Sequence, residues 1–132
     1  MAIIIMEKYK DIKGYEEHYQ ISDFGNVRSK TRLVKRMRNG KDSSQIKKGK
    51  LISSFNSRKG YKRCTLNKDG VKKNFLIHRL VGIAFISNDK NKAQINHKNG
   101  IKDDNRILNL EWMTNTENQN HATDNNLRYY QK

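Results

Sequence analysis

Hydrophobic and polar residues alternate with changing periods along the chain, and each period predicts a type of secondary structure. Over residues 7–29, aromatic and aliphatic positions recur between glycine turns, which predicts two short strands. Alternation returns at residues 61–66 and again at residues 71–75. The segment between them, residues 67–70, ends in an Asp-Gly pair that favours positive φ angles, so this region predicts a β-hairpin.

After this hairpin the apolar positions recur at helical spacing, which predicts a buried amphipathic helix over residues 76–86. Beyond a polar connector, the pattern predicts a strand at 93–95, a long loop, and a second strand at 110–113. Thr114 and Glu117 have the spacing of a capping box, so a last helix should begin beside them. We therefore expect an α+β fold, in which a small N-terminal antiparallel β module precedes a strand–strand–helix (ββα) unit in an extended molecule.

Size and composition limit what this chain can be. Its 132 residues are 34% hydrophobic, so we expect a modest core, divided between an N-terminal unit at residues 7–65 and a C-terminal unit at residues 75–126. Cys64 is the single cysteine, which excludes a disulfide framework and a cysteine zinc site and fits a reducing compartment. No apolar run is long enough for a membrane span. We expect a soluble, cytoplasmic protein without membrane contact, and nothing in the sequence implies a protein partner.

The basic charge of the chain is concentrated in one continuous segment. Residues 26–79 hold 18 lysine and arginine residues against 2 acidic ones, a net charge of +16, whereas the rest holds 10 against 11, a net charge of −1. Acidic residues are too few in this segment for internal pairing, so the expected partner is a polyanion, and we predict double-stranded DNA. Residues 28–50 contain few apolar positions, so we expect them to be mobile until phosphates neutralise their charge.

Basic and aromatic side chains of this segment are the candidate DNA contacts. Arginine and lysine bind phosphate, and a tyrosine can stack or pack on the sugar-phosphate edge. The candidates are Arg28, Arg32, Arg36, Arg38, Arg58, Lys59, Tyr61, Lys62 and Arg63.

Three polar residues in the C-terminal unit have a spacing that fits a small metal-dependent nuclease site. His97 comes first, Asn109 follows twelve residues later, and Asn118 follows nine residues after that. In such a site a histidine activates water, one asparagine fixes a loop, and another holds a metal ion from a helix. Asn118 falls in the first turns of the predicted last helix, so we expect it to face the preceding strands on the same side as His97.

Three segments of the chain resemble, in the same order, the HNH nucleases of the phage and intron homing type. The first, at residues 14–29, contains YQISDFGNVRS and is similar to the nuclease-associated DNA-binding module of that family. The second, at residues 78–86, begins HRLV and resembles the helix that leads into the catalytic unit. The third, at residues 96–118, contains NHKNG and NLEW and resembles the catalytic ββα-metal motif.

The resemblance implies a role for each polar residue of the third segment. His97 would be the general base that takes a proton from the attacking water, and Asn109 would be the loop asparagine that aims it. Asn96 and Asn118 would ligate a single divalent ion, Mg²⁺ or Mn²⁺. Many relatives carry an aspartate in place of Asn96. Two neutral amide oxygens predict a weak site, which fills well only when the scissile phosphate adds its charge.

The implied activity is hydrolysis of DNA phosphodiester bonds that leaves 5′-phosphate ends, in a phage-encoded or bacterial cytoplasmic protein. One site per chain predicts nicking of one strand in each binding event. The competing interpretation is a non-catalytic DNA- or RNA-binding protein, in which Asn96 has weakened the metal site of a degenerate nuclease frame. Cleavage in the presence of Mg²⁺ and Mn²⁺ separates the two interpretations.

Two further histidines and an arginine have more than one interpretation. His78 and Arg79 lie together on the predicted helix as candidate phosphate contacts, and a packing or capping role for His78 is an equal alternative. His121 lies one helical turn after Asn118, where we expect it to contact phosphate or to support a metal ligand.

Overall fold

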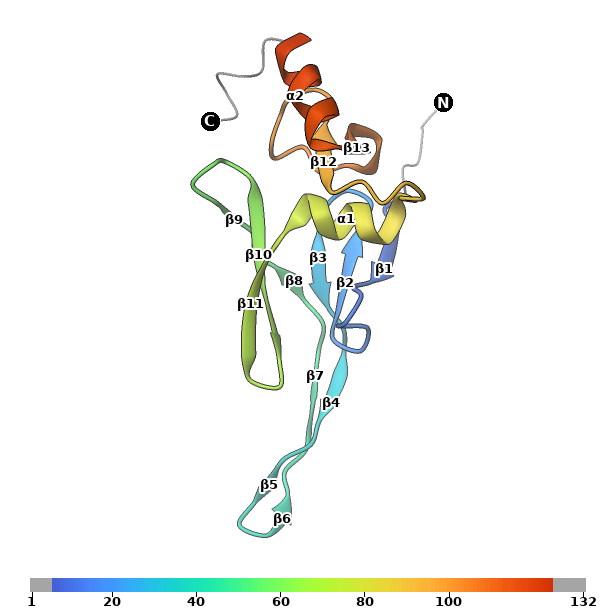
Figure 1. Cartoon of the computed structure of the whole chain (residues 1–132). Coiled ribbons are helices and arrows are strands. Elements are labelled where there is room, and N and C mark those ends of the chain that lie inside the picture. Colours follow the sequence, from blue (N-terminus) through green and yellow to red (C-terminus); the bar gives the residue numbers. More distant parts are fainter. Residues whose placement is uncertain (1–5, 125–132) are drawn as a thin grey trace, which may run out of the picture.

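The computed structural model describes residues 6–124, with side chains described as far as residue 120. Figure 1 shows a sheet of N-terminal strands in the middle of the molecule, a projecting pair of strands at one end, and a helix-and-hairpin unit at the other. The α+β class and the extended shape predicted from the sequence are confirmed. No helix in this part of the chain is long and apolar enough to cross a membrane.

The N-terminal strands form a four-stranded antiparallel sheet in the order β1, β2, β3, β8. These strands are β1 (Tyr9–Asp11), β2 (Tyr19–Ser22), β3 (Val27–Ser29) and β8 (Leu51–Ile52). Residues 7–29 therefore contain three strands where two were predicted. Strands of three residues are too short for alternation to show their number.

Residues 32–47, which we call the basic arm, form a long two-stranded ladder that projects from the body of the molecule (Figure 1). Its elements are β4 (Arg32–Val34), β5 (Met37–Arg38), β6 (Lys41–Asp42) and β7 (Gln45–Lys47). β4 pairs with β7, and β5 pairs with β6. The segment was expected to be mobile, but the structure pairs its backbone instead. A tight turn closes the ladder, because Asn39 and Gly40 have the positive φ angles, 53° and 77°, that an Asn-Gly hairpin turn requires.

A second hairpin leads into the first helix. β10 (Lys62–Lys68) pairs with β11 (Val71–Leu76), and β9 (Phe55–Asn56) adds a short third strand. The predicted turn lies between β10 and β11, and its Asp-Gly pair has φ angles of 53° and 79°. α1 (Ile77–Phe85) follows directly, where the apolar spacing predicted a helix.

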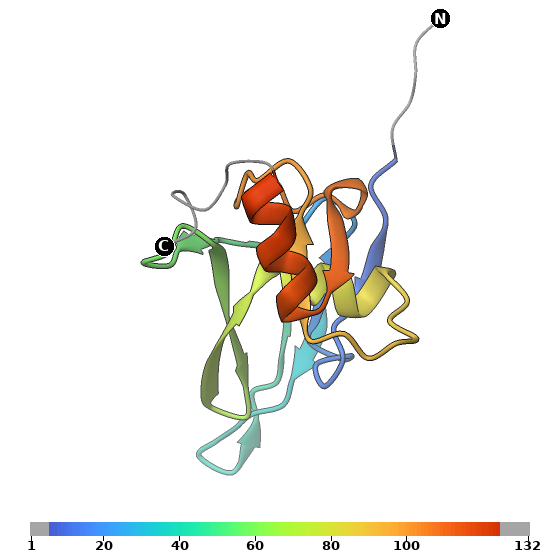
Figure 2. The same cartoon turned by 45° about the horizontal axis from the view of Figure 1, so that its top comes forward.

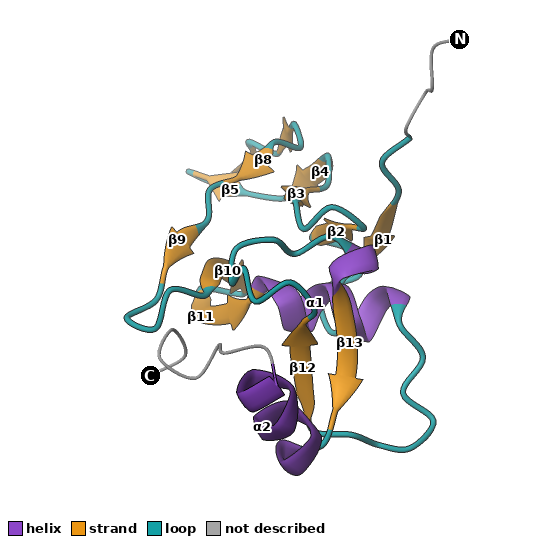
Figure 3. Ribbon diagram, turned by 90° about the horizontal axis from the view of Figure 1, so that it is seen from above, coloured by secondary structure: helices purple, strands orange, loops and turns teal. Residues whose placement is uncertain are grey.

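The C-terminal unit has the predicted order of strand, loop, strand and helix. Its elements are β12 (Gln94–His97), a 3-10 turn (Ile107–Asn109), β13 (Leu110–Met113) and α2 (Asn115–Asp124). The predicted capping box is present, since Glu117 N–H donates to Thr114 Oγ1 at 3.1 Å and Thr114 N–H donates to Glu117 Oε1 at 3.3 Å. The antiparallel β12–β13 hairpin lies between α1 and α2, as Figure 2 and Figure 3 show from two directions.

One continuous hydrophobic core joins these parts. It contains Ile21 from the N-terminal sheet, Leu66 from β10, Val81 from α1 and Ile95 from β12. Gly82 lies so close to β12 that any Cβ at this position would collide with Cδ1 of Ile95. The N-terminal sheet and the ββα unit therefore pack into one body through α1, which places the N-terminal turns against the candidate site.

Candidate functional site

The β12–β13 hairpin presents opposite faces to the two helices. On the face toward α2, Asn118 donates from Nδ2 to Oε1 of Gln94 at 3.0 Å. Asn96, two residues along the same strand, shares that face, whereas His97 leaves the strand on the face toward α1. The expectation that Asn118 and His97 lie on the same side was wrong. Asn118 contacts Gln94, whose side chain lies on the face of β12 opposite to that of His97. The structure instead brings Asn118 to the face of Asn96.

Two of the polar side chains on the α2 face have their amide orientation fixed by hydrogen bonds. Nδ2 of Asn96 donates to Oε1 of Glu111, its partner across the ladder, at 3.2 Å. Nδ2 of Asn118 is likewise occupied by Gln94, so both Oδ1 atoms point away from these partners. Neither Oδ1 accepts a hydrogen bond from the described residues, although Asn96 as a whole is only 2% exposed and Asn118 is half-buried. Two free amide oxygens beside a carboxylate suit a hard divalent cation.

His97 lies on the α1 face in a cluster of three rings. It is 5% exposed, and its ring centroid lies 5.0 Å from that of His78 and 5.8 Å from that of Tyr61. Burial lowers the pKa of His97 below the usual value for histidine, while its hydrogen bond to Asn105 acts in the opposite direction. A histidine with a lowered pKa is neutral at physiological pH and can therefore accept a proton.

Asn105 is a partner of His97 that sequence reasoning did not identify. Its Oδ1 lies 2.8 Å from Nε2 of His97, and both residues are 5% exposed. An amide oxygen can only accept a hydrogen bond, so Nε2 carries the ring proton and Nδ1 keeps its lone pair. Asn105 was visible in the sequence as a polar residue of the long loop. Its contact with His97 depends on the path of that loop, which no local pattern predicts.

Asn109 is 6% exposed and braces the loop between β12 and β13. Its Oδ1 accepts from Asn99 N–H at 3.1 Å, and its Nδ2 donates to the Asp104 carbonyl at 2.9 Å. The Asp104 carboxylate in turn binds Arg106 through two bonds of 2.7 and 2.8 Å. Arg106, followed by Asn99, lowers the pKa of Asp104 to about 2. The loop that carries Asn105 is thus fixed from both ends.

His78 and Arg79 lie on α1, and both contact other parts of the protein. His78 is 7% exposed, and burial, assisted by the charges of His97 and Arg79, lowers its pKa to about 3. Its Nδ1 is buried without a partner among the described residues. Arg79 donates to the Ala93 carbonyl at 2.8 Å and lies 5.5 Å from the Trp112 ring. The burial of His78 against the ring of His97 favours the packing alternative over a direct phosphate contact.

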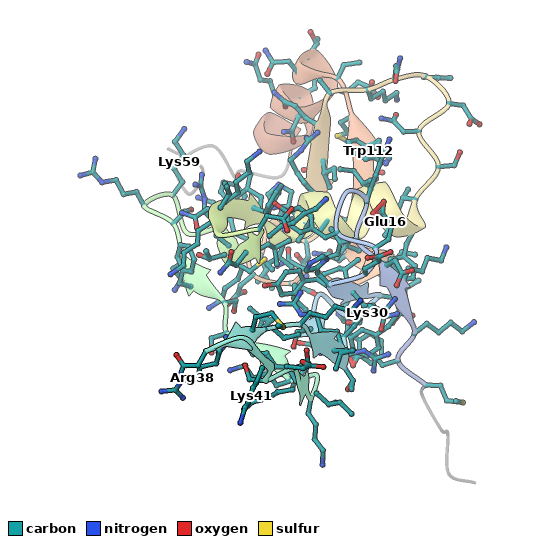
Figure 4. All side chains as sticks on the ribbon, turned by 90° about the horizontal axis from the view of Figure 1, so that it is seen from below. Glu16, Lys30, Arg38, Lys41, Lys59 and Trp112 are labelled. Atoms are coloured by element: carbon teal, nitrogen blue, oxygen red, sulfur yellow. The ribbon has the colours of Figure 1, made fainter. Side chains whose placement is uncertain are left out.

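The exposed candidate DNA contacts lie at separate places on the molecule. Arg36 and Arg38 are exposed on the basic arm, and Arg58 and Lys59 are exposed on the turn before β10. Figure 4 shows Lys59 and the pair Arg38 and Lys41 pointing outward from these two places. A long duplex could contact both, since phosphates are spaced along its whole length.

The remaining candidates lie elsewhere on the molecule. Arg28 lies on the N-terminal sheet, where its guanidinium is 3.6 Å from the ring centroid of Tyr9 and donates to Oε1 of Gln20. The side chain of His121 lies outside the described residues. Five candidates are half-buried: Arg32, Tyr61, Lys62, Arg63 and Arg79.

Comparison with known proteins gives two family matches in chain order. The NUMOD4 motif matches residues 7–67, and the HNH endonuclease family matches residues 75–120. The DNA endonuclease I-HmuI of Bacillus phage SP01 is 40% identical over 115 residues, which are 85% of this chain and 57% of that protein. Two HNH endonucleases of Acanthamoeba polyphaga mimivirus are 37% and 41% identical, over 94% and 88% of this chain and 32% and 25% of their own lengths.

A solved structure gives the same correspondence. The structure described as DNA binding and cleavage by the HNH homing endonuclease I-HmuI matches 91% of this chain and 60% of that chain, with a TM-score of 0.70 and 34% identity. The chain thus spans less than two thirds of the length of each of these relatives. The order of the two motifs, the fold and the sequence identity agree, and this chain belongs to the HNH endonuclease family as a homologue of I-HmuI.

Proposed function

We propose that this chain is a metal-dependent DNA endonuclease that hydrolyses phosphodiester bonds with His97 as the general base. The observation that carries the proposal is the buried pair of His97 and Asn105, with 2.8 Å between Nε2 and Oδ1, at the end of a strand that also carries Asn96. With Nε2 occupied, Nδ1 of a neutral His97 is the atom that takes the proton from the attacking water. Asn109 supports this step by holding the loop on which Asn105 lies.

Asn96 and Asn118 would hold the divalent ion through their Oδ1 atoms. Both amide groups are oriented by hydrogen bonds through Nδ2, which leaves each Oδ1 without a hydrogen bond from the described residues. Donors that are all oxygen favour Mg²⁺, and Mn²⁺ fits the same donors. When bound, the ion would stabilise the negative charge that develops on the phosphate and on the departing 3′ oxygen.

Glu111 adds a negative charge to a metal site that the sequence predicted to bind metal weakly through two neutral amide ligands. Its carboxylate lies 3.2 Å from Nδ2 of Asn96, so a negative charge stands beside the two neutral ligands. Asn96 can donate to this carboxylate, which an aspartate could not do. The pairing of Asn96 with Glu111 therefore supports a metal site whose negative charge lies on Glu111 instead of on an aspartate at position 96. It weakens the interpretation of a degenerate, non-catalytic frame.

The position of His97 supports a single reaction site despite the two faces of the hairpin. His97 is the last residue of β12, and Asn96 precedes it. A phosphate placed at the end of this strand could meet the base from one face and the ligands from the other. One such site per chain predicts nicking of one DNA strand in each binding event.

We propose double-stranded DNA as the substrate, held chiefly through its phosphates. The support is the net charge of +16 over residues 26–79 and the exposure of Arg36 and Arg38 on the basic arm. Contacts of this kind give affinity with little dependence on sequence and a steep dependence on salt.

Incubation of supercoiled plasmid with the protein and Mg²⁺ or Mn²⁺ tests the proposal. We expect nicked circles to form first and linear DNA later, and EDTA to stop the reaction. Direct conversion to linear DNA at low protein concentration would contradict nicking. Binding of the plasmid without cleavage under either ion would contradict the endonuclease and favour a DNA-binding protein.

A further inference from the structure

The turn between β2 and β3 belongs to the N-terminal sheet, yet it packs against the loop that carries Asn105. The Asp23 carbonyl accepts a hydrogen bond from Ile107 N–H at 2.9 Å. Gly25 has a φ angle of +88°, and a Cβ at this position would lie 2.8 Å from Cβ of Asn105. The backbone at Gly25 therefore approaches Asn105 as closely as a residue without a side chain allows.

Ser22 makes this turn rigid. It is 0% exposed, and its Oγ accepts from the N–H groups of Phe24 and Asn26 at 3.2 and 2.9 Å. Its carbonyl accepts from Gly25 N–H at 3.1 Å. Since the turn is fixed by hydrogen bonds to the buried Ser22, it can act as a firm support for the residue that packs on it.

We propose that Asn105 is a positioning residue that fixes the tautomer and orientation of His97, and that the N-terminal turn at residues 22–26 holds Asn105 in place. The inference rests on the proposed function only in taking His97 as the general base. Its consequence is that the N-terminal sheet contributes to the chemical step by packing, separately from any contribution that it makes to DNA affinity.

The chemistry of the pair explains why the support matters. A neutral imidazole exists as two tautomers, and only the form with the proton on Nε2 leaves Nδ1 free as a base. His78 and Tyr61 surround the ring of His97 without a hydrogen bond to it among the described residues. Asn105 is thus the described side chain that selects the tautomer, and a displaced Asn105 would leave the ring free to adopt either form.

The test measures the tautomer directly in the full chain labelled with ¹⁵N-histidine. Long-range ¹H–¹⁵N correlation spectra distinguish a proton on Nε2 from one on Nδ1, and His97→Ala identifies the His97 signals by their loss. We expect the proton on Nε2 in the parent protein, a mixture in Asn105→Ala, and retention of the Nε2 proton in Asn105→Asp, which keeps an acceptor oxygen. Single-turnover cleavage of supercoiled plasmid with Mn²⁺ should fall about 10–100-fold in Asn105→Ala with unchanged DNA affinity.

A matched pair of glycine variants tests the support from the turn. Gly14 and Gly25 both lie in turns of the N-terminal sheet, with φ angles of +84° and +88°, but nothing lies within 4 Å of a Cβ at Gly14. Alanine should therefore strain both turns similarly, and only Gly25→Ala should disturb the His97 tautomer and the cleavage rate. Equal effects of the two variants on tautomer and rate would overturn the role of the turn. If Gly25→Ala does not fold, the smaller shift of Asn105 caused by Ser22→Ala, read from the same His97 signals, decides the point.

The outcomes separate this inference from the proposed function. If Asn105→Ala changes neither the tautomer nor the rate while His97→Ala abolishes cleavage, Asn105 is not a positioning residue and the general base stands. If His97→Ala cleaves as fast as the parent, the general base is wrong, and the spectra alone then decide whether Asn105 orients the ring.

Discussion

The basic arm and the β12–β13 hairpin are both two-stranded antiparallel ladders, but they use the ladder in opposite ways. In the arm even apolar side chains face solvent, with Met37 and Ile46 each 72% exposed. In β12 even polar side chains are enclosed, with Asn96 2% and His97 5% exposed. The arm therefore depends on backbone pairing and carries charge outward, whereas β12 depends on packing and holds individual atoms in place.

This difference predicts how each region responds to substitution. Phosphate contacts are many and similar, so the loss of one arginine should weaken binding by a modest factor and leave the reaction unchanged. A buried base with a single hydrogen-bond partner has no substitute, so its loss should affect the rate much more than the affinity.

Removal of His97, the proposed general base, should have the largest effect. His97→Ala should lower the single-turnover cleavage rate by about 10²–10⁴-fold, because proton transfer contributes to the transition state alone. The dissociation constant for the same DNA should stay nearly unchanged. A rate measurement at saturating protein, paired with a binding titration, checks both statements, and a variant that cuts at the parent rate would remove His97 from the mechanism.

Neutralisation of the arm should produce the opposite pattern. The double variant Arg36→Gln, Arg38→Gln should weaken DNA binding and reduce the slope of log affinity against log salt by about 1.8, which is about 0.9 for each lost phosphate contact. Its cleavage rate at saturation should match the parent. Lys90→Gln is the control, since Lys90 is an exposed lysine outside the basic segment. An equal change of slope in the control would show that the arm has no special role.

Asn96→Asp should change metal binding and stability in opposite directions. A carboxylate ligand should lower the metal concentration needed for half-maximal cleavage by several-fold. Without metal, however, the hydrogen bond to Glu111 is replaced by repulsion between two carboxylates. The free energy of unfolding should then fall by about 1–3 kcal/mol. Denaturant titrations with and without metal measure this, and the added change Glu111→Gln should restore stability in the metal-free protein.

The buried ring of His78, which packs against His97, should make the free energy of unfolding depend on pH. The pKa of His78 is about 3 in the folded protein, so between its ordinary value of 6.5 and about 3 only the unfolded chain binds the proton. The contribution of His78 to the free energy of unfolding is therefore complete above pH 6.5. It should decrease as the pH falls below 6.5, by at most about 1.4 kcal/mol per pH unit. Comparison of the parent with His78→Gln by urea denaturation should show a shallower slope in the variant. Identical slopes would contradict the burial of a neutral His78.

The same contrast explains which features could be predicted from the sequence. The capping box of Thr114 and Glu117 and the helix after residue 76 depend on neighbours in the chain, so local patterns were sufficient for them. The turn at Asn39 and Gly40 was also a local signal, although the high charge around it suggested a mobile segment.

The hydrogen-bond partners of the site residues could not be predicted from local sequence patterns. The bonds of His97 with Asn105 and of Asn96 with Glu111 depend on the loop path and on the strand register. The face on which Asn118 lies depends on how α2 packs against β12. A motif can therefore indicate which residues form a site, but the hydrogen bonds that orient them come from the tertiary structure.

We expect the basic arm to supply affinity and the β12 site to supply the chemical step. Single-turnover cleavage of one supercoiled plasmid separates these roles when it is followed across protein concentrations for the parent, the arm double variant, His97→Ala and the combined variant. We predict that the arm changes shift only the concentration at half-saturation, that His97→Ala lowers only the maximal rate, and that the combined variant shows both effects independently. A lowered maximal rate in the arm variant, or a shifted half-saturation in His97→Ala, would contradict the division.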